Sequence, residues 1–416
     1  MLIRRRKKLP VHFRTHLDYL EYKRSDIIRG LKYYFHNLRI AKGIDSVYKT
    51  FTGPTLVQIN ITNKCNNNCI ACWVGSPYLE DSKDLREWKK QELSFDIIKK
   101  VMRELHSLGT RKLYFGGGGE PFLHPEIMQI LKYAKKLGFE CDINTNFTLL
   151  NKEMIDELVS INFDQINVSL WAASPEMYVK MHPNKNVSTF LQIKDNLKYL
   201  ASIKRIRHTP HVNLYNVITS WNYTEIEDMA RLGLEVEADS VQFVPVDPIS
   251  GKTEFLILNE KQRKEVIQKI KKAKQIIDED ETNLSKSNLF ILDYDRFITR
   301  MLSKNAGKGE YECEVINNIP CYAGWTYSRI LANGDVNFCL KSDEVLGNIY
   351  KQSFKEIWNN AKLADIRRRY KNDKTKDSFF LTTNCFKTCD NIALNQDTED
   401  MLNSLNLFDK IMKKII

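Results

Sequence analysis

The stretch TLVQINITNKCNNNCIAC, residues 55–72, decides the fold and the chemistry. Residues 55–60 are a short β-rich run and predict a strand. Cys65, Cys69 and Cys72 follow directly at Cx3Cx2C spacing, on what we expect to be a loop. Three thiolates at this spacing can hold three corners of a [4Fe–4S] cube. One iron would then have no protein ligand.

The number of ligands separates two kinds of metal site. Structural clusters and structural zinc normally use four protein ligands, whereas an open position usually means chemistry. The closest histidine, His106, lies inside a predicted helix. The alternative is a zinc site completed by a residue that is distant in sequence.

Working outward, β-rich runs and helical periodicity alternate along the chain. We predict strands at 55–60, 111–115, 139–144, 164–170, 211–218 and 240–246. Alternating strands and helices favour a parallel sheet in the α/β class. Six units are too few for a closed barrel of eight, so we expect an open, partial (β/α)6 barrel.

Changes in composition divide the chain into five regions. An acidic run, 278–281, and the polar residues after it interrupt the βα pattern. The following region carries five of the nine cysteines and predicts a smaller cysteine-rich α+β domain. We expect a basic N-terminal helical region at 1–52, the barrel at 53–280, a connection at 281–310, the cysteine-rich domain at 311–395 and a C-terminal helix at 396–416.

Polar loops follow three further predicted strands. The second strand runs into four glycines and Glu120, where the backbone can approach a ligand closely and a carboxylate can pair with an ammonium group. The alternative is a flexible turn before the next helix. Asn146 follows the third predicted strand and Ser169 lies near the end of the fourth, and such residues are also common in turns. Ligands of parallel barrels bind at this edge of the sheet.

A second set of cysteines lies in the C-terminal region. Cys321 and Cys339 flank a predicted hairpin at Asn333-Gly334, and Cys385 and Cys389 lie one helical turn apart. Together they supply four thiolates for one closed cluster. The alternative is a zinc ribbon, which would prefer Cx2C pairs. Cys313 is a fifth candidate ligand, eight residues before Cys321.

Cx3Cx2C after the first strand of a βα repeat resembles the signature of the radical S-adenosylmethionine (radical SAM) enzymes. One departure is Ala71, because the family usually has an aromatic residue before the third cysteine. The resemblance implies that Cys65, Cys69 and Cys72 bind a catalytic [4Fe–4S] cluster whose open iron binds S-adenosylmethionine. Reductive cleavage would then give a 5′-deoxyadenosyl radical that abstracts hydrogen from a substrate.

The same resemblance implies roles for the other motifs. The glycine loop resembles the GGEP motif, so Gly118, Gly119 and Glu120 are expected to bind S-adenosylmethionine, together with Asn146 and Ser169. The second cysteine set resembles a SPASM extension, shortened toward the single-cluster twitch type. It implies a second, auxiliary [4Fe–4S] cluster on Cys321, Cys339, Cys385 and Cys389. No catalytic acid or base is identified.

The substrate is the open part of this prediction. No winged-helix peptide-recognition module is visible in residues 1–50, which favours a carbohydrate or other small molecule. The first alternative is a maturase that modifies a ribosomal peptide or protein side chain. The second is a non-catalytic metal-binding adaptor with a basic arm. The enzyme would need an electron donor such as flavodoxin or ferredoxin.

Composition and charge bear on location. The chain is 43% hydrophobic and 28% charged, as in ordinary globular proteins, and has no run long enough to span a membrane. Nine cysteines without a signal-peptide pattern predict a cytoplasmic protein with reduced thiols.

The positive charge is concentrated in residues 1–50, which hold 13 Lys and Arg and four acids, a net +9 of the total +11. Apolar spacing predicts an amphipathic helix from about 16 to 41. A helix packed on the barrel is the favoured reading, with peripheral membrane contact second. A partner-docking helix is also open, and no nucleic acid is expected because no nucleic-acid-binding motif is present.

Overall fold

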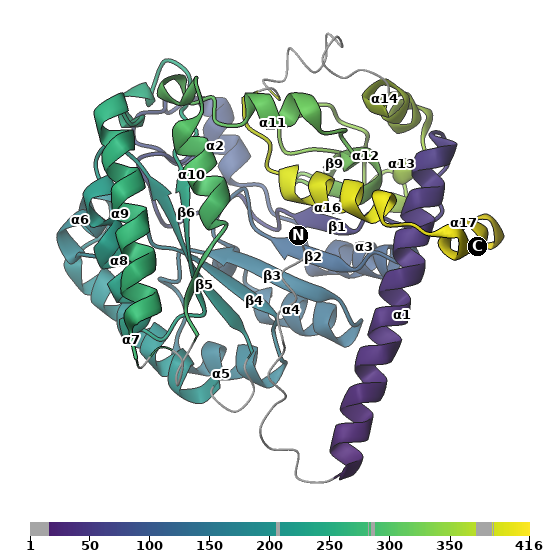
Figure 1. Ribbon diagram of the computed structural model, residues 1–416, viewed down its shortest axis with the longest axis horizontal. Helices are drawn as coiled ribbons and strands as arrows, with labels where there is room; N and C mark the ends of the chain where they lie inside the picture. Colours follow the sequence, from purple (N-terminus) through teal and green to yellow (C-terminus); the bar gives the residue numbers. More distant parts are fainter. Residues whose placement is uncertain (1–15, 205–208, 282, 284–287, 372–384, 386) are drawn as a thin grey trace.

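The computed structural model describes residues 16–204, 209–281, 283, 288–371, 385 and 387–416, with side chains from Gly30 onward except at 371. A mixed sheet forms its centre (Figure 1). Its strands are β1 (Leu56–Ile59), β2 (Lys112–Phe115), β3 (Glu140–Thr145), β4 (Gln165–Ser169), β5 (His211–Ile218), β6 (Ser240–Pro245), β7 (Phe290–Leu292), β8 (Tyr327–Ile330), β9 (Asp335–Asn337) and β10 (Gly347–Asn348).

Consecutive strands from β1 to β7 pair in parallel, in chain order. Val57, for example, lies beside Leu113 of β2, and Leu113 lies beside Cys141 of β3. This order confirms the α/β class with a parallel, open sheet. Cys141 is fully buried within it and packs as a small apolar side chain.

Four further strands extend the sheet beyond the six predicted strands, one at the β6 edge and three at the β1 edge. β7 arises within 281–310, the predicted connection, and pairs with β6. On the other edge, β8 of the cysteine-rich region pairs in parallel with β1. β9 and β10 then continue the sheet with antiparallel pairs. The C-terminal region is therefore joined to the barrel by backbone hydrogen bonds.

Helices lie outside the curved sheet (Figure 1). In the barrel they are α2 (Lys83–Lys89), α3 (Phe95–Ser107), α4 (Ile127–Lys136), α5 (Lys152–Ser160), α6 (Pro175–Met181), α7 (Val187–Lys204), α8 (Ile226–Glu235), α9 (Glu260–Glu279) and α10 (Tyr294–Leu302), with 3-10 turns η1 (Pro121–Leu123), η2 (Tyr223–Glu225) and η3 (Glu254–Leu256).

The remaining helices flank the cysteine-rich region. They are α1 (His16–Ser46), α11 (Cys313–Asn318), α12 (Ala323–Thr326), α13 (Phe354–Trp358), α14 (Ala361–Lys371), α16 (Ile392–Asn403) and α17 (Leu407–Ile415), with a 3-10 turn η5 (Ala306–Lys308). No helix in the described part of the chain is long and apolar enough to cross a membrane.

Helix α3 illustrates how the sequence forms these elements. Ser94 caps its first turn by accepting from the N–H of Ile97 at 3.5 Å. Ile98, Val101 and Met102 recur at helical spacing and are buried against the sheet. Each buried apolar side chain of this size contributes roughly 1.5–3 kcal/mol.

The basic N-terminal region forms α1, whose second half packs on the protein. Ile40 and Ile44 are buried against Tyr322 and Trp325 of the cysteine-rich region. This half of α1 is therefore packed on the protein, as expected, although these contacts are with the cysteine-rich region and not with the barrel. The side chains of 16–29, and residues 1–15 altogether, lie outside the described structure.

Candidate metal and cofactor sites

Three thiols lie together on the cysteine loop, residues 63–72, which follows β1. The N–H of Cys72 donates to the carbonyl oxygen of Cys69 at 3.0 Å, which turns the loop back on itself. Burial raises the pKa of Cys69 well above its ordinary value, and the Cys72 and Cys65 thiols raise it further. Burial raises the pKa of Cys65 to about 11, although part of its surface is exposed. The thiols therefore oppose one another's ionisation.

This donor set fits a cluster with three protein ligands. Among the described residues, no three His, Cys, Asp or Glu side chains converge closely enough to hold a single metal ion. Thiolates around a [4Fe–4S] cube bind different irons, so they need not converge on one point. The positive irons would stabilise thiolates whose charges otherwise repel one another.

A segment that the sequence analysis gave no role holds this loop in place. His182, which ends α6, is fully buried, and its Nδ1 lies 3.1 Å from the Cys69 sulfur. Its Nε2 lies 3.0 Å from the carbonyl oxygen of Leu170, so we assign the proton to Nε2. Burial lowers the pKa of His182 to about 4 and keeps the ring neutral. Asn184 donates from Nδ2 to the carbonyl oxygen of Asn66 at 2.9 Å.

The glycine loop after β2 packs directly on the cysteine loop. A Cβ on Gly119 would lie 2.0 Å from the carbonyl oxygen of Lys64, and one on Gly118 would lie 2.0 Å from Oδ1 of Asn63. The N–H of Glu120 also donates to the Lys64 carbonyl at 2.8 Å. Glycine is needed here because the two backbones touch.

Glu120 is buried and joins the ends of β2 and β3. Its carboxylate accepts from the N–H of Phe122 at 3.1 Å, the hydroxyl of Thr145 at 2.7 Å and the N–H of Asn146 at 2.7 Å. Burial nevertheless raises its pKa to about 7, because it outweighs these hydrogen bonds and the opposing effect of the Lys185 cation. A carboxylate has about four acceptor positions. Three positions of Glu120 are used, so one acceptor position remains for a ligand. A ligand with an ammonium group could donate a hydrogen bond to it.

The other two predicted cofactor residues lie at the same edge of the sheet. Asn146 donates from Nδ2 to Oδ1 of Asn66 at 2.8 Å, so it also contacts the cysteine loop. Ser169 ends β4 and pairs with Tyr215 of β5. Both positions follow carboxyl ends of strands, where parallel barrels bind ligands.

The inner face of the sheet is polar. Asn213 donates from Nδ2 to Oδ1 of Asn167 and to Oε1 of Gln242, both at 3.0 Å. Tyr327 of β8 donates to Oε1 of Gln58 of β1 at 2.7 Å. Apolar residues between these positions face the helices. The interior thus presents amide and hydroxyl groups.

Four thiols of the second set also interact with one another. Burial raises the pKa of Cys339, and the thiols of Cys321 and Cys385 raise it further. Burial likewise raises the pKa of Cys389, with added contributions from Cys339 and Cys321. The predicted hairpin between the first two cysteines is confirmed by the antiparallel pair β8–β9.

Cys313 is the fifth cysteine of the C-terminal region. It begins α11, and its sulfur faces Oε2 of Glu310 at 3.9 Å. Burial raises its pKa, and the carboxylate of Glu310 raises it further. A ligand role for Cys313 stays a prediction.

A buried carboxylate holds the Cys389 segment. Glu312 accepts from Nε of Arg296 at 2.7 Å, from Nε of Arg300 at 2.9 Å and from the N–H of Cys389 at 3.2 Å. Burial opposes its ionisation, but the two arginines outweigh this effect and lower its pKa to about 2. Glu312 therefore stays charged.

Side chains from both cysteine groups meet at the carboxyl edge of the barrel. Lys341, two residues after Cys339, lies 5.5 Å from the ring centre of Trp73, which follows Cys72. Lys341 also pairs with Asp247 after β6. Burial opposes its charge, but Asp390 and Asp247 raise its pKa. The segments that carry the two thiol groups thus meet at this end of the barrel.

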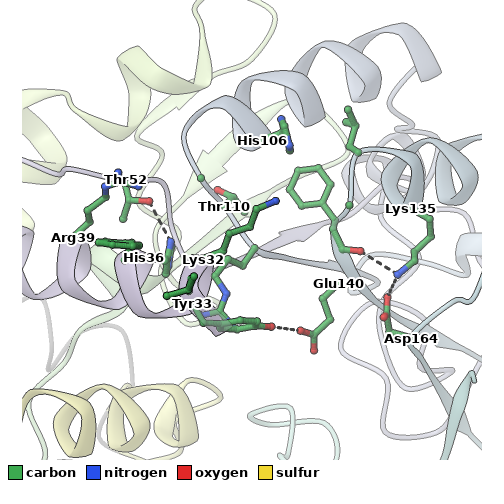
Figure 2. A pocket seen from close by; sticks show the side chains of 17 residues that line it. Lys32, Tyr33, His36, Arg39, Thr52, His106, Thr110, Lys135, Glu140 and Asp164 are labelled. Carbon is green, nitrogen blue, oxygen red and sulfur yellow. Dashed lines mark hydrogen bonds and ion pairs between the residues drawn. The ribbon is translucent and has the colours of Figure 1, made fainter. Parts of the chain in front are cut away.

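A separate cavity of about 740 Å³ lies at the opposite end of the strands, between α1 and the starts of β2 and β3. Figure 2 shows Tyr33 pointing toward Glu140, with an O–O distance of 2.6 Å, and Lys135 pointing toward Asp164. None of the predicted site residues lines this cavity.

Two family models match the chain. The radical SAM superfamily model matches residues 59–233, and the SPASM model, an iron-sulfur cluster-binding domain, matches residues 321–390. The first match covers the cysteine loop, the glycine loop and β2–β5. The second covers all four thiols of the second set.

Relatives with known names share part of the chain. A tungsten-containing aldehyde ferredoxin oxidoreductase cofactor-modifying protein from Pyrococcus furiosus is 28% identical over 46% of this chain and 52% of its own length. A probable GTP 3′,8-cyclase from Thermococcus kodakarensis is 29% identical over 52% of this chain and 72% of its own length. The match thus spans about half of the first relative.

The fold resembles that of a solved structure, Streptococcus suis SuiB bound to the precursor peptide SuiA. The TM-score is 0.56 with 16% identity, over 83% of this chain and 71% of that chain.

Proposed function

We propose that this chain is a radical SAM enzyme with one auxiliary cluster, because the radical SAM superfamily model matches residues 59–233 and the SPASM model matches residues 321–390. The observation that carries the proposal is the placement of three mutually repelling thiols beside the buried carboxylate of Glu120. The thiols provide a site for an iron cluster, and the carboxylate provides a site for a cation.

In this proposal, Cys65, Cys69 and Cys72 hold the catalytic [4Fe–4S] cluster. When bound and reduced, the cluster supplies the electron that cleaves S-adenosylmethionine to methionine and a 5′-deoxyadenosyl radical. Glu120 and the backbone of Gly118 and Gly119 position the amino group of the cofactor. The packing of the glycine loop on the cysteine loop supports this role, because it places the cofactor-binding residues next to the three thiols.

Asn146 and Ser169 complete the proposed cofactor site from the next two strands. Asn146 is oriented by Glu120 and by Asn66, so its side chain is held at the cysteine loop. Ser169 is half-buried at the end of β4 and presents a hydroxyl group at the same edge.

Cys321, Cys339, Cys385 and Cys389 would hold the auxiliary cluster. Their mutual effect on each other's pKa supports one shared site. Four thiolates close the coordination of a cube. The Arg296–Glu312–Arg300 group would keep the Cys389 segment in position as iron binds.

We propose a polar small molecule, such as a carbohydrate, as the substrate class. The amide and hydroxyl groups of the barrel interior support it, as do Lys341 and Asp390 beside the second thiol set. A peptide or protein side chain is the alternative. It is supported by SuiB, which has been solved with a precursor peptide.

The partners and location follow from the chemistry. The catalytic cluster would receive its electron from a donor such as flavodoxin or ferredoxin, which points to the cytoplasm. We also propose peripheral membrane contact through residues 1–50. Because the second half of α1 packs on the protein, this contact would involve the residues before it.

Anaerobic reconstitution tests the function. We expect about eight irons per chain, as two cubes of four. We also expect 5′-deoxyadenosine when S-adenosylmethionine and a reductant are supplied. A colourless protein that holds only zinc and leaves the cofactor intact would instead support the non-catalytic adaptor.

A further inference from the structure

Helix α17 binds the rest of the protein through its polar face. Tyr34 of α1 donates from its hydroxyl to Oδ1 of Asp409 at 2.7 Å. Lys413 forms an ion pair with Asp45, also on α1. Asp409 and Lys413 are four residues apart, so they lie on the same side of the helix. This side faces α1.

The apolar face of α17 is therefore left largely uncovered. Leu407, Phe408, Ile411 and Ile415 are 75%, 63%, 51% and 71% exposed. At about 100° per residue these four side chains fall within one face of the helix. Figure 1 shows α17 at the edge of the molecule, outside α1. Most amphipathic helices bury this face instead.

Cations border the exposed apolar face. Lys410 and Lys414 are exposed beside Leu407 and Ile411, and Lys42 of α1 lines the same groove of about 440 Å³. The two nearby acids, Asp409 and Asp45, are already bonded to Tyr34 and Lys413. Among the described side chains no acid forms an ion pair with Lys410 or Lys414, so the surface offers apolar side chains next to positive charge.

We propose that α17 binds the surface of a membrane that contains anionic lipid. An apolar helix face bordered by lysines fits the boundary between lipid headgroups and acyl chains, where the lysines reach the phosphates. The proposal concerns a described element outside residues 1–50, and it does not depend on the chemistry at the cysteines.

A second copy of this chain fits the same surface less well. A helix of nine residues is about 14 Å long, and stable protein interfaces bury about 800 Å² on each partner. Two copies would also bring their lysines together without an acid to pair with them. An anionic bilayer matches both the apolar residues and the charge.

Vesicle sedimentation with the full chain tests the proposal. We expect binding to vesicles with roughly one-third phosphatidylserine in phosphatidylcholine, weaker binding at high salt, and little binding to phosphatidylcholine alone. The double variant Phe408→Ser, Ile411→Ser should bind roughly tenfold more weakly, because it removes apolar groups that enter the interface. Lys410→Glu, Lys414→Glu should weaken only the phosphatidylserine-dependent part.

Leu302→Ser is the matched control, because Leu302 of α10 is 67% exposed on a different element. It should bind vesicles like the wild type. Vesicle binding that is absent in the wild type, or equal in the wild type and the Phe408 and Ile411 double variant, would overturn the proposal. A concentration-dependent dimer that only this double variant abolishes would assign the surface to a second copy instead.

Discussion

Gly119 provides a test of the contact between the glycine loop and the cysteine loop. A methyl group there would meet the carbonyl oxygen of Lys64 at 2.0 Å, and this backbone group has no flexible end that can move away. Gly119→Ala should therefore separate the loops, destabilise the protein by roughly 1–3 kcal/mol and lower iron retention at the first thiol set. Thermal unfolding and iron analysis after reconstitution measure both effects.

Gly30→Ala is the matched control for this change. A Cβ at Gly30 meets nothing within 4 Å, and alanine favours a helix over glycine by about 1 kcal/mol. This variant should unfold at the wild-type temperature or slightly above it. Equal iron retention in both variants would show that the loop contact does not position the cysteines.

His36 predicts a pH dependence of stability. It is buried on α1 between the hydroxyls of Thr55 at 3.0 Å and Thr52 at 3.2 Å. Burial lowers its pKa to about 4, so between about 6.5 and 4 the unfolded chain binds the extra proton. Stability should therefore fall as the pH decreases through this range, by about 2 kcal/mol at about pH 5.

The comparison uses His36→Gln, which keeps a polar side chain but does not titrate. Chemical unfolding at neutral pH and at about pH 5 should show a smaller loss for this variant than for the wild type. The same loss in both proteins would assign the pH dependence to other groups.

At the scale of elements, the segment after α10 and the Cys389 segment are held together by Glu312. Its removal leaves two partly buried arginines without their carboxylate, and breaking a buried ion pair typically costs 3–5 kcal/mol. Glu312→Ala should lower the iron content toward that of one cluster and leave cofactor cleavage at the first thiol set. The exposed neighbour Glu314 supplies the control, and Glu314→Gln should retain both clusters. Loss of cleavage together with unchanged iron would contradict this assignment.

Local patterns predicted most elements but not their long-range contacts. The spacing of Ile98, Val101 and Met102 was sufficient for α3, and Asn333-Gly334 was sufficient for the β8–β9 hairpin. The pairing of β8 with β1 joins residues about 270 positions apart, and no local pattern encodes it. The inward polar face of α17 depends in the same way on Tyr34 and Asp45.

In the whole molecule, the segments that carry the two thiol sets meet where Lys341 contacts Trp73. The Cx3Cx2C spacing predicted the first set, and the family resemblance predicted its neighbours at Glu120 and Asn146. The contact of His182 with Cys69 was not predicted, because it joins α6 to a loop 113 residues away. Lys341 beside Trp73 likewise became visible only in three dimensions.

We propose that the two thiol sets hold separate clusters and that only the cluster on the first set supports cleavage of S-adenosylmethionine. The direct measurement is iron content and 5′-deoxyadenosine formation in Cys69→Ala and Cys385→Ala after anaerobic reconstitution. Both variants should retain about four irons. Cys69→Ala should form no 5′-deoxyadenosine, whereas Cys385→Ala should still form some. Cleavage in Cys69→Ala, or identical behaviour of the two variants, would contradict the account.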